Sequence, residues 1–211
     1  MLPDLFETFI VALPAIFFVV DPFGVVPIYL AITAGDTAKR AREMALRACL
    51  VAGGLLTFFA LFGGLVFKVF GVTLSAFRVA GGFLLLITSL DMLRGRTSQT
   101  KTSPAEELES TQKEDVAVVP LAMPLLAGPG AIATAMVLRS RGTGILIAVP
   151  VVISIVVTFV ASYLILRGAH IVLRVLGQSG VAILQRLMGL ILAAIAVQFI
   201  AEGAHELMRL H

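Results

Sequence analysis

Apolar residues run through this chain in long continuous stretches that short polar segments separate. Apolar and polar positions do not alternate within the stretches, which favours helices over strands. A helix needs about 20 apolar residues to cross the ~30 Å hydrocarbon layer of a bilayer. We therefore predict an all-α integral membrane protein with six transmembrane helices. The six stretches are residues 5–34, 49–67, 72–93, 116–138, 145–166 and 181–200.

Composition supports a lipid environment. Of the 211 residues 59% are hydrophobic and 14% are charged, with a mean hydropathy of +1.03. A soluble domain carries about a quarter charged residues, so this chain has too little polar surface for a water-exposed globule. The net charge of +3 could suggest nucleic acid, but the basic residues adjoin the apolar stretches. We expect the lipid bilayer as partner and no nucleic acid.

The basic residues also predict the orientation in the membrane, because lysine and arginine concentrate in cytoplasmic loops. Ten lie in the first, third and fifth connections, and four lie on the other face. Both termini are therefore predicted on the non-cytoplasmic face. The ten are Lys39, Arg40, Arg42, Arg47, Arg94, Arg96, Lys101, Lys113, Arg167 and Arg174.

A polar segment at 94–115 divides the chain, and its composition predicts a mobile cytoplasmic linker. The flanking parts, 1–93 and 116–211, share two patterns. Prolines five residues apart occur at 22 and 27 and again at 124 and 129, an offset of 102. Arg-x-x-Gly occurs at 78–81 and at 186–189, an offset of 108. Because each part holds three spans, the second copy must insert upside down, so we predict two inverted three-helix repeats.

Proline and glycine are expected to break the first and fourth spans. The expected helical pieces are 6–20 and 28–34, then 116–123 and 131–138. Non-helical backbone at membrane depth is tolerated only inside protein or beside a watery cavity, so the breaks predict a substrate site. The alternative is a pair of proline kinks that bind nothing. The predicted substrate-binding residues are Asp21, Pro22, Gly24, Pro27, Thr33, Gly128, Pro129, Gly130 and Thr134.

Charged residues inside the spans add candidate partners. A carboxylate at the middle of a span, such as Asp21, is costly and usually faces a cavity or a partner. Arg78 and Arg186 either extend to the membrane interface, pair with Asp21 or bind substrate. Gln185 and Gln198 either line a polar path or form hydrogen bonds between helices.

The sequence lacks the common motifs of nucleotide-binding, zinc-binding and nucleophilic enzyme sites. It contains no G-x-x-x-x-G-K-[ST], no H-E-x-x-H and no G-x-S-x-G, and Cys49 is its one cysteine. We expect no enzymatic activity, no cofactor and no metal.

Four segments together resemble the MarC family of six-span proteins: 21–27, 77–82, 124–132 and 186–189. The resemblance implies a prokaryotic inner-membrane protein. SnatA-type members of this group transport small neutral amino acids such as alanine and glycine. The leading hypothesis is therefore a secondary transporter that exports or exchanges such solutes, zwitterionic or neutral, driven by a proton or sodium gradient. A channel or passive facilitator and a non-transporting scaffold remain alternatives, and an oligomer is left open.

Overall fold

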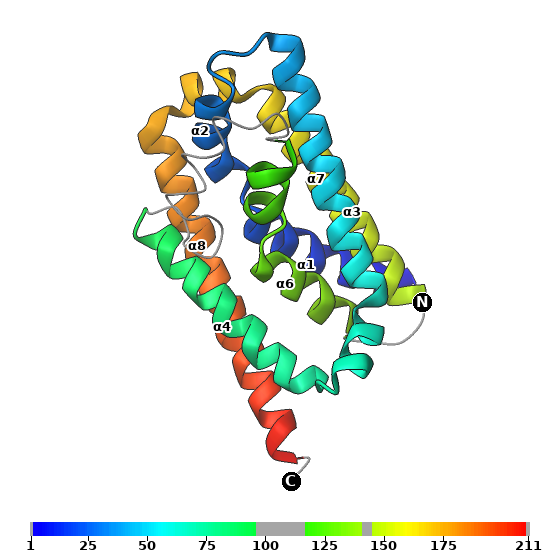
Figure 1. Cartoon of the computed structure of the whole chain (residues 1–211). Coiled ribbons are helices and arrows are strands. Elements are labelled where there is room, and N and C mark those ends of the chain that lie inside the picture. Colours follow the sequence, from blue (N-terminus) through cyan, green and yellow to red (C-terminus); the bar gives the residue numbers. More distant parts are fainter. Residues whose placement is uncertain (1, 96–116, 141–144, 210–211) are drawn as a thin grey trace.

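The computed structural model describes residues 2–95, 117–140 and 145–209, and every regular element in these ranges is a helix (Figure 1). This confirms the predicted all-helical fold class for that part of the chain. The predicted linker falls almost entirely on residues 96–116, which lie outside the described ranges. In chain order the elements are α1 (Leu2–Val20), α2 (Pro22–Ile32), α3 (Ala38–Phe70), α4 (Leu74–Leu93), the π-helix η1 (Ala117–Leu126), α6 (Pro129–Ser140), α7 (Ile145–Arg167) and α8 (Ala169–Arg209).

Five stretches of the described residues are long and apolar enough to cross a membrane. The fourth predicted span is not among them, because it is divided between η1 and α6. These have 10 and 12 residues, and neither alone reaches across a bilayer. The count of six spans therefore stays a prediction. The five stretches are Leu5–Ile32, Ala38–Leu65, Leu74–Leu93, Ile147–Arg167 and Ala169–Arg209.

Two helices extend well beyond the apolar stretches that predicted them. The second predicted span began at residue 49, but α3 begins at Ala38 because alanine, arginine, glutamate, methionine and leucine fill 38–48. The Thr37 hydroxyl accepts from the Arg40 amide at 3.3 Å, which caps the start of α3. The sixth predicted span covered 181–200, whereas α8 runs from 169 to 209 with a non-helical residue, Gly177, at φ 65°.

Helices α4 and α8 run antiparallel and pack closely along one side of the bundle (Figure 1). A methyl group added to Gly82 on α4 would lie 2.9 Å from the Ala196 carbonyl oxygen. One added to Gly189 on α8 would lie 3.1 Å from the Ser89 carbonyl oxygen. The two backbones therefore approach as closely as small residues permit in membrane bundles.

The broken segments fill the centre between this pair and the pair formed by α3 and α7 (Figure 1). Eight of the twelve residues of α6 are buried, including Gly130 and Thr134. The outside of the bundle carries large apolar side chains that are half or more exposed, such as Leu50, Phe62 and Leu164. Exposed apolar surface of this extent suits hydrocarbon rather than water.

Candidate functional site

The first span breaks at a single residue, Asp21. Helix α1 ends with the Asp21 amide donating to the Phe17 carbonyl, and α2 begins with the Val25 amide donating to the Asp21 carbonyl. Asp21 has φ 54° and ψ 59°, and it is the one non-glycine residue with positive φ in the described ranges. Aspartate tolerates this left-handed conformation better than most residues, because its short side chain can form local hydrogen bonds.

The Asp21 side chain caps α2. Its Oδ1 accepts from the Gly24 amide at 3.0 Å, and its carboxylate lies at the positive end of the helix dipole. Pro22 occupies the first position of α2, where a missing amide hydrogen costs nothing. Asp21 is only 4% exposed, so its carboxylate lies inside the protein.

Pro27 lies inside α2, which corrects the expected helical pieces of the first span. The pieces were predicted to end at residue 20 and to restart at 28, with both prolines in the break. The second piece instead restarts at Pro22, because proline suits the first turn of a helix. Only Asp21 is left outside the two helices.

Gln185 of α8 is the second partner of Asp21. Its Nε2 donates to Asp21 Oδ2 at 3.4 Å. Gly24 lies against both side chains, and a methyl group added there would collide with the Asp21 carboxylate and the Gln185 amide. Gly24 therefore makes room for a contact between the break and α8.

The second broken segment is interrupted at Ala127 and Gly128. The Ala127 amide donates to the Ala122 carbonyl at 2.9 Å, five residues back, as in the π-helix before it. Helix α6 then begins at Pro129, and the Gly128 carbonyl accepts from the amides of Ala131 and Ile132. The pieces expected at 116–123 and 131–138 are thus longer than predicted on the sides facing the break.

The two breaks lie beside each other. A methyl group added to Gly130 would lie 3.6 Å from Cγ2 of Val19, two residues before Asp21, and 3.7 Å from Oγ1 of Thr88 on α4. Helix α1 also packs on α6, and α2 packs on η1. The two breaks are therefore close to each other, with Asp21, Pro22, Gly128 and Gly130 buried, Gly24 half-buried and Pro129 exposed.

Two threonines of the predicted site have local partners. The Thr134 hydroxyl is fully buried and donates to the Gly130 carbonyl at 2.8 Å, within the first turns of α6. Thr33 caps the other end of α2, where its hydroxyl donates to the Tyr29 carbonyl at 2.7 Å. The 11 residues of α2 separate Thr33 from Asp21 by about 18 Å along the helix axis, so Thr33 does not lie at the break.

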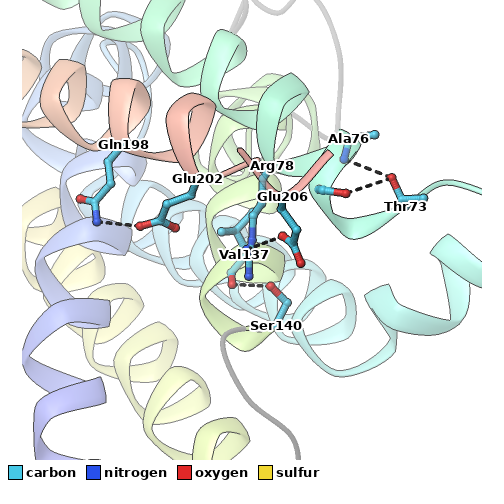
Figure 2. A network of polar contacts seen from close by, with 9 residues as sticks. Thr73, Ala76, Arg78, Val137, Ser140, Gln198, Glu202 and Glu206 are labelled. Carbon is cyan, nitrogen blue, oxygen red and sulfur yellow. Dashed lines mark hydrogen bonds and ion pairs between the residues drawn. The ribbon is translucent and has the colours of Figure 1, made fainter. Parts of the chain in front are cut away.

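The arginines of the predicted site lie toward opposite ends of the α4–α8 pair. Arg78 Nη1 contacts Glu206 Oε2 at 2.9 Å, which joins α4 to α8 (Figure 2). The same close-up shows Gln198 bonded to Glu202 on α8 and Ser140 at the end of α6. Arg186 has its Nη2 3.7 Å from the position of a methyl group added to Gly95, just beyond α4. The ion pair observed for Arg78 is therefore with Glu206.

Within the described ranges, no group of three or more histidine, cysteine, aspartate or glutamate side chains has a metal-binding arrangement. Cys49 is buried and forms no disulfide. The polar atoms at the breaks are instead carboxylate and amide oxygens and backbone groups. Such groups can hold charged ends of a small solute by hydrogen bonds.

Comparison with known proteins identifies the family. The family described as "MarC family integral membrane protein" matches residues 6–208. The UPF0056 membrane protein MJ1677 of Methanocaldococcus jannaschii is 41% identical over 198 residues, covering 93% of this chain and 96% of that protein. Escherichia coli YhcE is 32% identical over 95% of this chain and 92% of its own length, and Bacillus subtilis YvbG is 36% identical over 90% of each. No solved structure matches the chain. The chain therefore belongs to the MarC family of integral membrane proteins, which has bacterial and archaeal members.

Proposed function

We propose that this protein is a secondary transporter that exports or exchanges small neutral amino acids at the expense of a proton or sodium gradient. The observation that carries the proposal is the buried, left-handed Asp21 at a helix break, next to a second break. A charged residue inside a membrane costs about 3 kcal/mol on insertion scales, and left-handed backbone about 1–2 kcal/mol. A strained and costly residue of this kind commonly marks a functional site.

The two breaks suit the two ends of a zwitterion. Asp21 supplies a carboxylate for an ammonium group. At the start of α6 the Gly130 amide and the positive end of the helix dipole suit a carboxylate, whereas Pro129 has no amide hydrogen and the amides of Ala131 and Ile132 donate to the Gly128 carbonyl. Broken helices in transporters place substrate charges in this manner. Little space remains around Gly24, which agrees with a small solute. The transported molecule is expected to leave unchanged, without covalent chemistry.

We also propose that the chain forms six spans as two inverted repeats, with η1 and α6 together as the fourth span. The helix contacts support this proposal, because they persist when the halves are exchanged. Helix α1 packs on α7 as η1 packs on α3, and α2 packs on α8 as α6 packs on α4. Pro22 and Pro129, which both begin a half-helix, are 107 residues apart, close to the 108 between Arg78 and Arg186.

In the proposed orientation both termini lie on the non-cytoplasmic face of a prokaryotic cell membrane. The start of α3 and the end of α7 then lie at the cytoplasmic face, and the Arg78–Glu206 ion pair at the other. A C-terminal reporter that is active only in the cytoplasm should be silent. Activity of that reporter would reverse the orientation.

Counterflow of labelled alanine and glycine by the purified protein in liposomes tests the proposed function. The wild-type protein should show saturable counterflow and net transport that depends on an imposed proton or sodium gradient. Asp21→Asn should lose or uncouple transport while its thermal unfolding midpoint stays near that of the wild type. Saturable counterflow without any gradient dependence would favour a passive facilitator. A stable Asp21→Asn protein with unchanged rate and ion dependence would exclude the proposed role of Asp21.

A further inference from the structure

A surface groove lies between α3 and α7, away from the helix breaks. The two helices run antiparallel, and the groove between them has a volume of about 380 Å³. On α3 it is lined by Leu46, Leu50 and Gly53, and on α7 by Ile155, Phe159 and Tyr163. The Thr57 hydroxyl, which also borders it, is already bonded to the Gly53 carbonyl at 2.7 Å. The lining therefore presents an almost entirely apolar surface.

Two glycines shape the groove. A methyl group added to Gly53 would lie 3.2 Å from the Phe159 ring, so Gly53 forms a floor where the helices are close. Gly54, one residue on, has nothing within 4 Å of such a group and leaves the groove open to the outside. Because the neighbouring Leu50 is 66% exposed, this side of the bundle faces the hydrocarbon of the membrane.

Two arginines stand at one end of the groove. Arg42 precedes Leu46 by one helical turn on α3, and Arg167 follows Tyr163 by one turn on α7. Because the helices are antiparallel, both arginines lie at the same end, where α3 begins and α7 finishes in Figure 1. Both are exposed. The ion pairs near this end join Lys39 with Glu43 and Arg40 with Asp36, and within the described residues neither Arg42 nor Arg167 forms an ion pair with a carboxylate.

We propose that this groove binds one anionic phospholipid of the surrounding membrane, with an acyl chain in the apolar channel and the phosphate between Arg42 and Arg167. Guanidinium groups recognise phosphate through paired hydrogen bonds. The charge argues for a lipid rather than a second copy of the chain, because a copy would bring the same two positive charges to this face. The basic residues assign this end of the groove to the cytoplasmic face, and basic residues near a membrane surface attract anionic lipid headgroups.

Native mass spectrometry of the full chain, released from nanodiscs with equal amounts of phosphatidylglycerol and phosphatidylcholine, tests this site. The wild-type protein should retain one phosphatidylglycerol per chain in preference to phosphatidylcholine. The double variant Arg42→Gln/Arg167→Gln should retain it about tenfold less, because each basic residue near an anionic surface contributes to lipid affinity. Gly54→Leu should fill the groove and reduce retention of both lipids.

Matched controls separate the groove from general effects. Gly64→Leu adds the same side chain to α3 at another open position, and Arg174→Gln removes an exposed arginine from α8. Both should retain lipid as the wild type does, and Arg42→Lys/Arg167→Lys should keep most of the preference. Circular dichroism and thermal unfolding verify that each variant is folded.

Three results would overturn the proposed lipid site. The first is a wild-type protein without preference between the two lipids, and the second is a folded double glutamine variant that retains phosphatidylglycerol fully. The third is a lipid-free wild-type dimer that Gly54→Leu converts to monomer, which would assign the groove to a second copy. None of these outcomes depends on whether the protein transports amino acids.

Discussion

At the first helix break a side chain organises the backbone, and at the second the backbone does so alone. Asp21 adopts a left-handed conformation, caps α2 through its carboxylate and accepts a hydrogen bond from Gln185. At the second break Gly128 caps α6 with its carbonyl, and a π-helix precedes it. Both half-helices begin with proline, so their starting geometry is shared while their charge differs.

This difference matters for a site that holds a zwitterion. Two half-helices that begin at the centre of a bundle would both present positive dipole ends. The Asp21 carboxylate adds a negative charge at the start of α2, so this end favours a cation. The start of α6 has no such carboxylate and keeps its preference for anions. If the two repeats had identical breaks, the site would suit a dianion or a dication better than a neutral amino acid. The asymmetry is thus the feature that the following variants probe.

The largest expected difference separates Gly24→Ala from Gly130→Ala. A methyl group at Gly24 collides with Asp21 and Gln185, and overpacking of this kind costs about 1–3 kcal/mol. At Gly130 the nearest atoms lie 3.4–3.7 Å from the added group, an ordinary contact. Gly130→Ala should change the free energy of unfolding by less than about 1 kcal/mol, since alanine also favours the helix. The free energy of unfolding of both variants is measured in detergent, and their transport is measured by alanine counterflow in liposomes.

Transport should follow the same order, with Gly24→Ala inactive. Equal losses of stability in the two glycine variants would contradict the difference in packing. An active Gly24→Ala protein would show that the contact between Asp21 and Gln185 is dispensable.

The next difference concerns the side chains that brace each half-helix. Asp21→Ala removes the cap of α2 and leaves alanine in left-handed backbone, at a combined cost of about 2 kcal/mol. Asp21→Asn keeps both the cap and the backbone tolerance, so it is the matched control. Thr134→Val removes only the hydrogen bond to the Gly130 carbonyl, worth below about 1 kcal/mol. Chemical unfolding of the three variants should rank them Asp21→Ala, then Thr134→Val, then Asp21→Asn.

Local sequence rules predicted where the helices are interrupted, but not which residues begin the second half of each broken helix. Asp-Pro at 21–22 and Gly-Pro at 128–129 are the signals, and helices do restart at Pro22 and Pro129. Pairing the prolines by equal spacing was misleading, because Pro27 lies inside α2 and Pro124 inside η1. The neighbours of a proline in the folded bundle decide whether it starts or interrupts a helix.

The sequence patterns could not predict contacts between residues that are far apart in the chain. Gln185 follows Asp21 by 164 residues, and only the packing of α2 on α8 brings them together. Arg78 was considered as a partner of Asp21, but its ion pair is with Glu206, on the neighbouring helix. Apolar stretches set the minimum length of α3 and α8, whereas their polar ends follow from helix propensity and capping.

A smaller effect is expected from the arginines that occupy matching positions in the two halves. Arg78 is 14% exposed in its side chain and pairs with Glu206, whose side chain is 47% exposed. A double-mutant cycle with Arg78→Ala and Glu206→Ala should give a coupling of about 0.5–1 kcal/mol, as for other partly exposed ion pairs. The same cycle with Arg186→Ala and Glu206→Ala should give no coupling, because Arg186 lies near Gly95 at the other end of the pair. Coupling of Glu206 to both arginines would show that the α4–α8 pair transmits strain along its length.

The smallest effect is expected from shortening the segment between the two halves. If contacts inside the bundle set each break, the segment predicted to be a linker at 94–115 should act only as a tether. Changing the length of a flexible loop twofold alters its closure free energy by only about 0.6 kcal/mol. Deleting several residues between 99 and 109 should therefore leave membrane insertion, the unfolding midpoint and alanine counterflow close to those of the wild type. Replacing the same residues with glycine and serine keeps the length and serves as the control. If the deletion abolishes counterflow in a folded protein while the replacement does not, the reach of the tether limits the motion of one half against the other. If both abolish it, the specific residues of the segment act on the transport path, and the two breaks cannot be treated as independent of it.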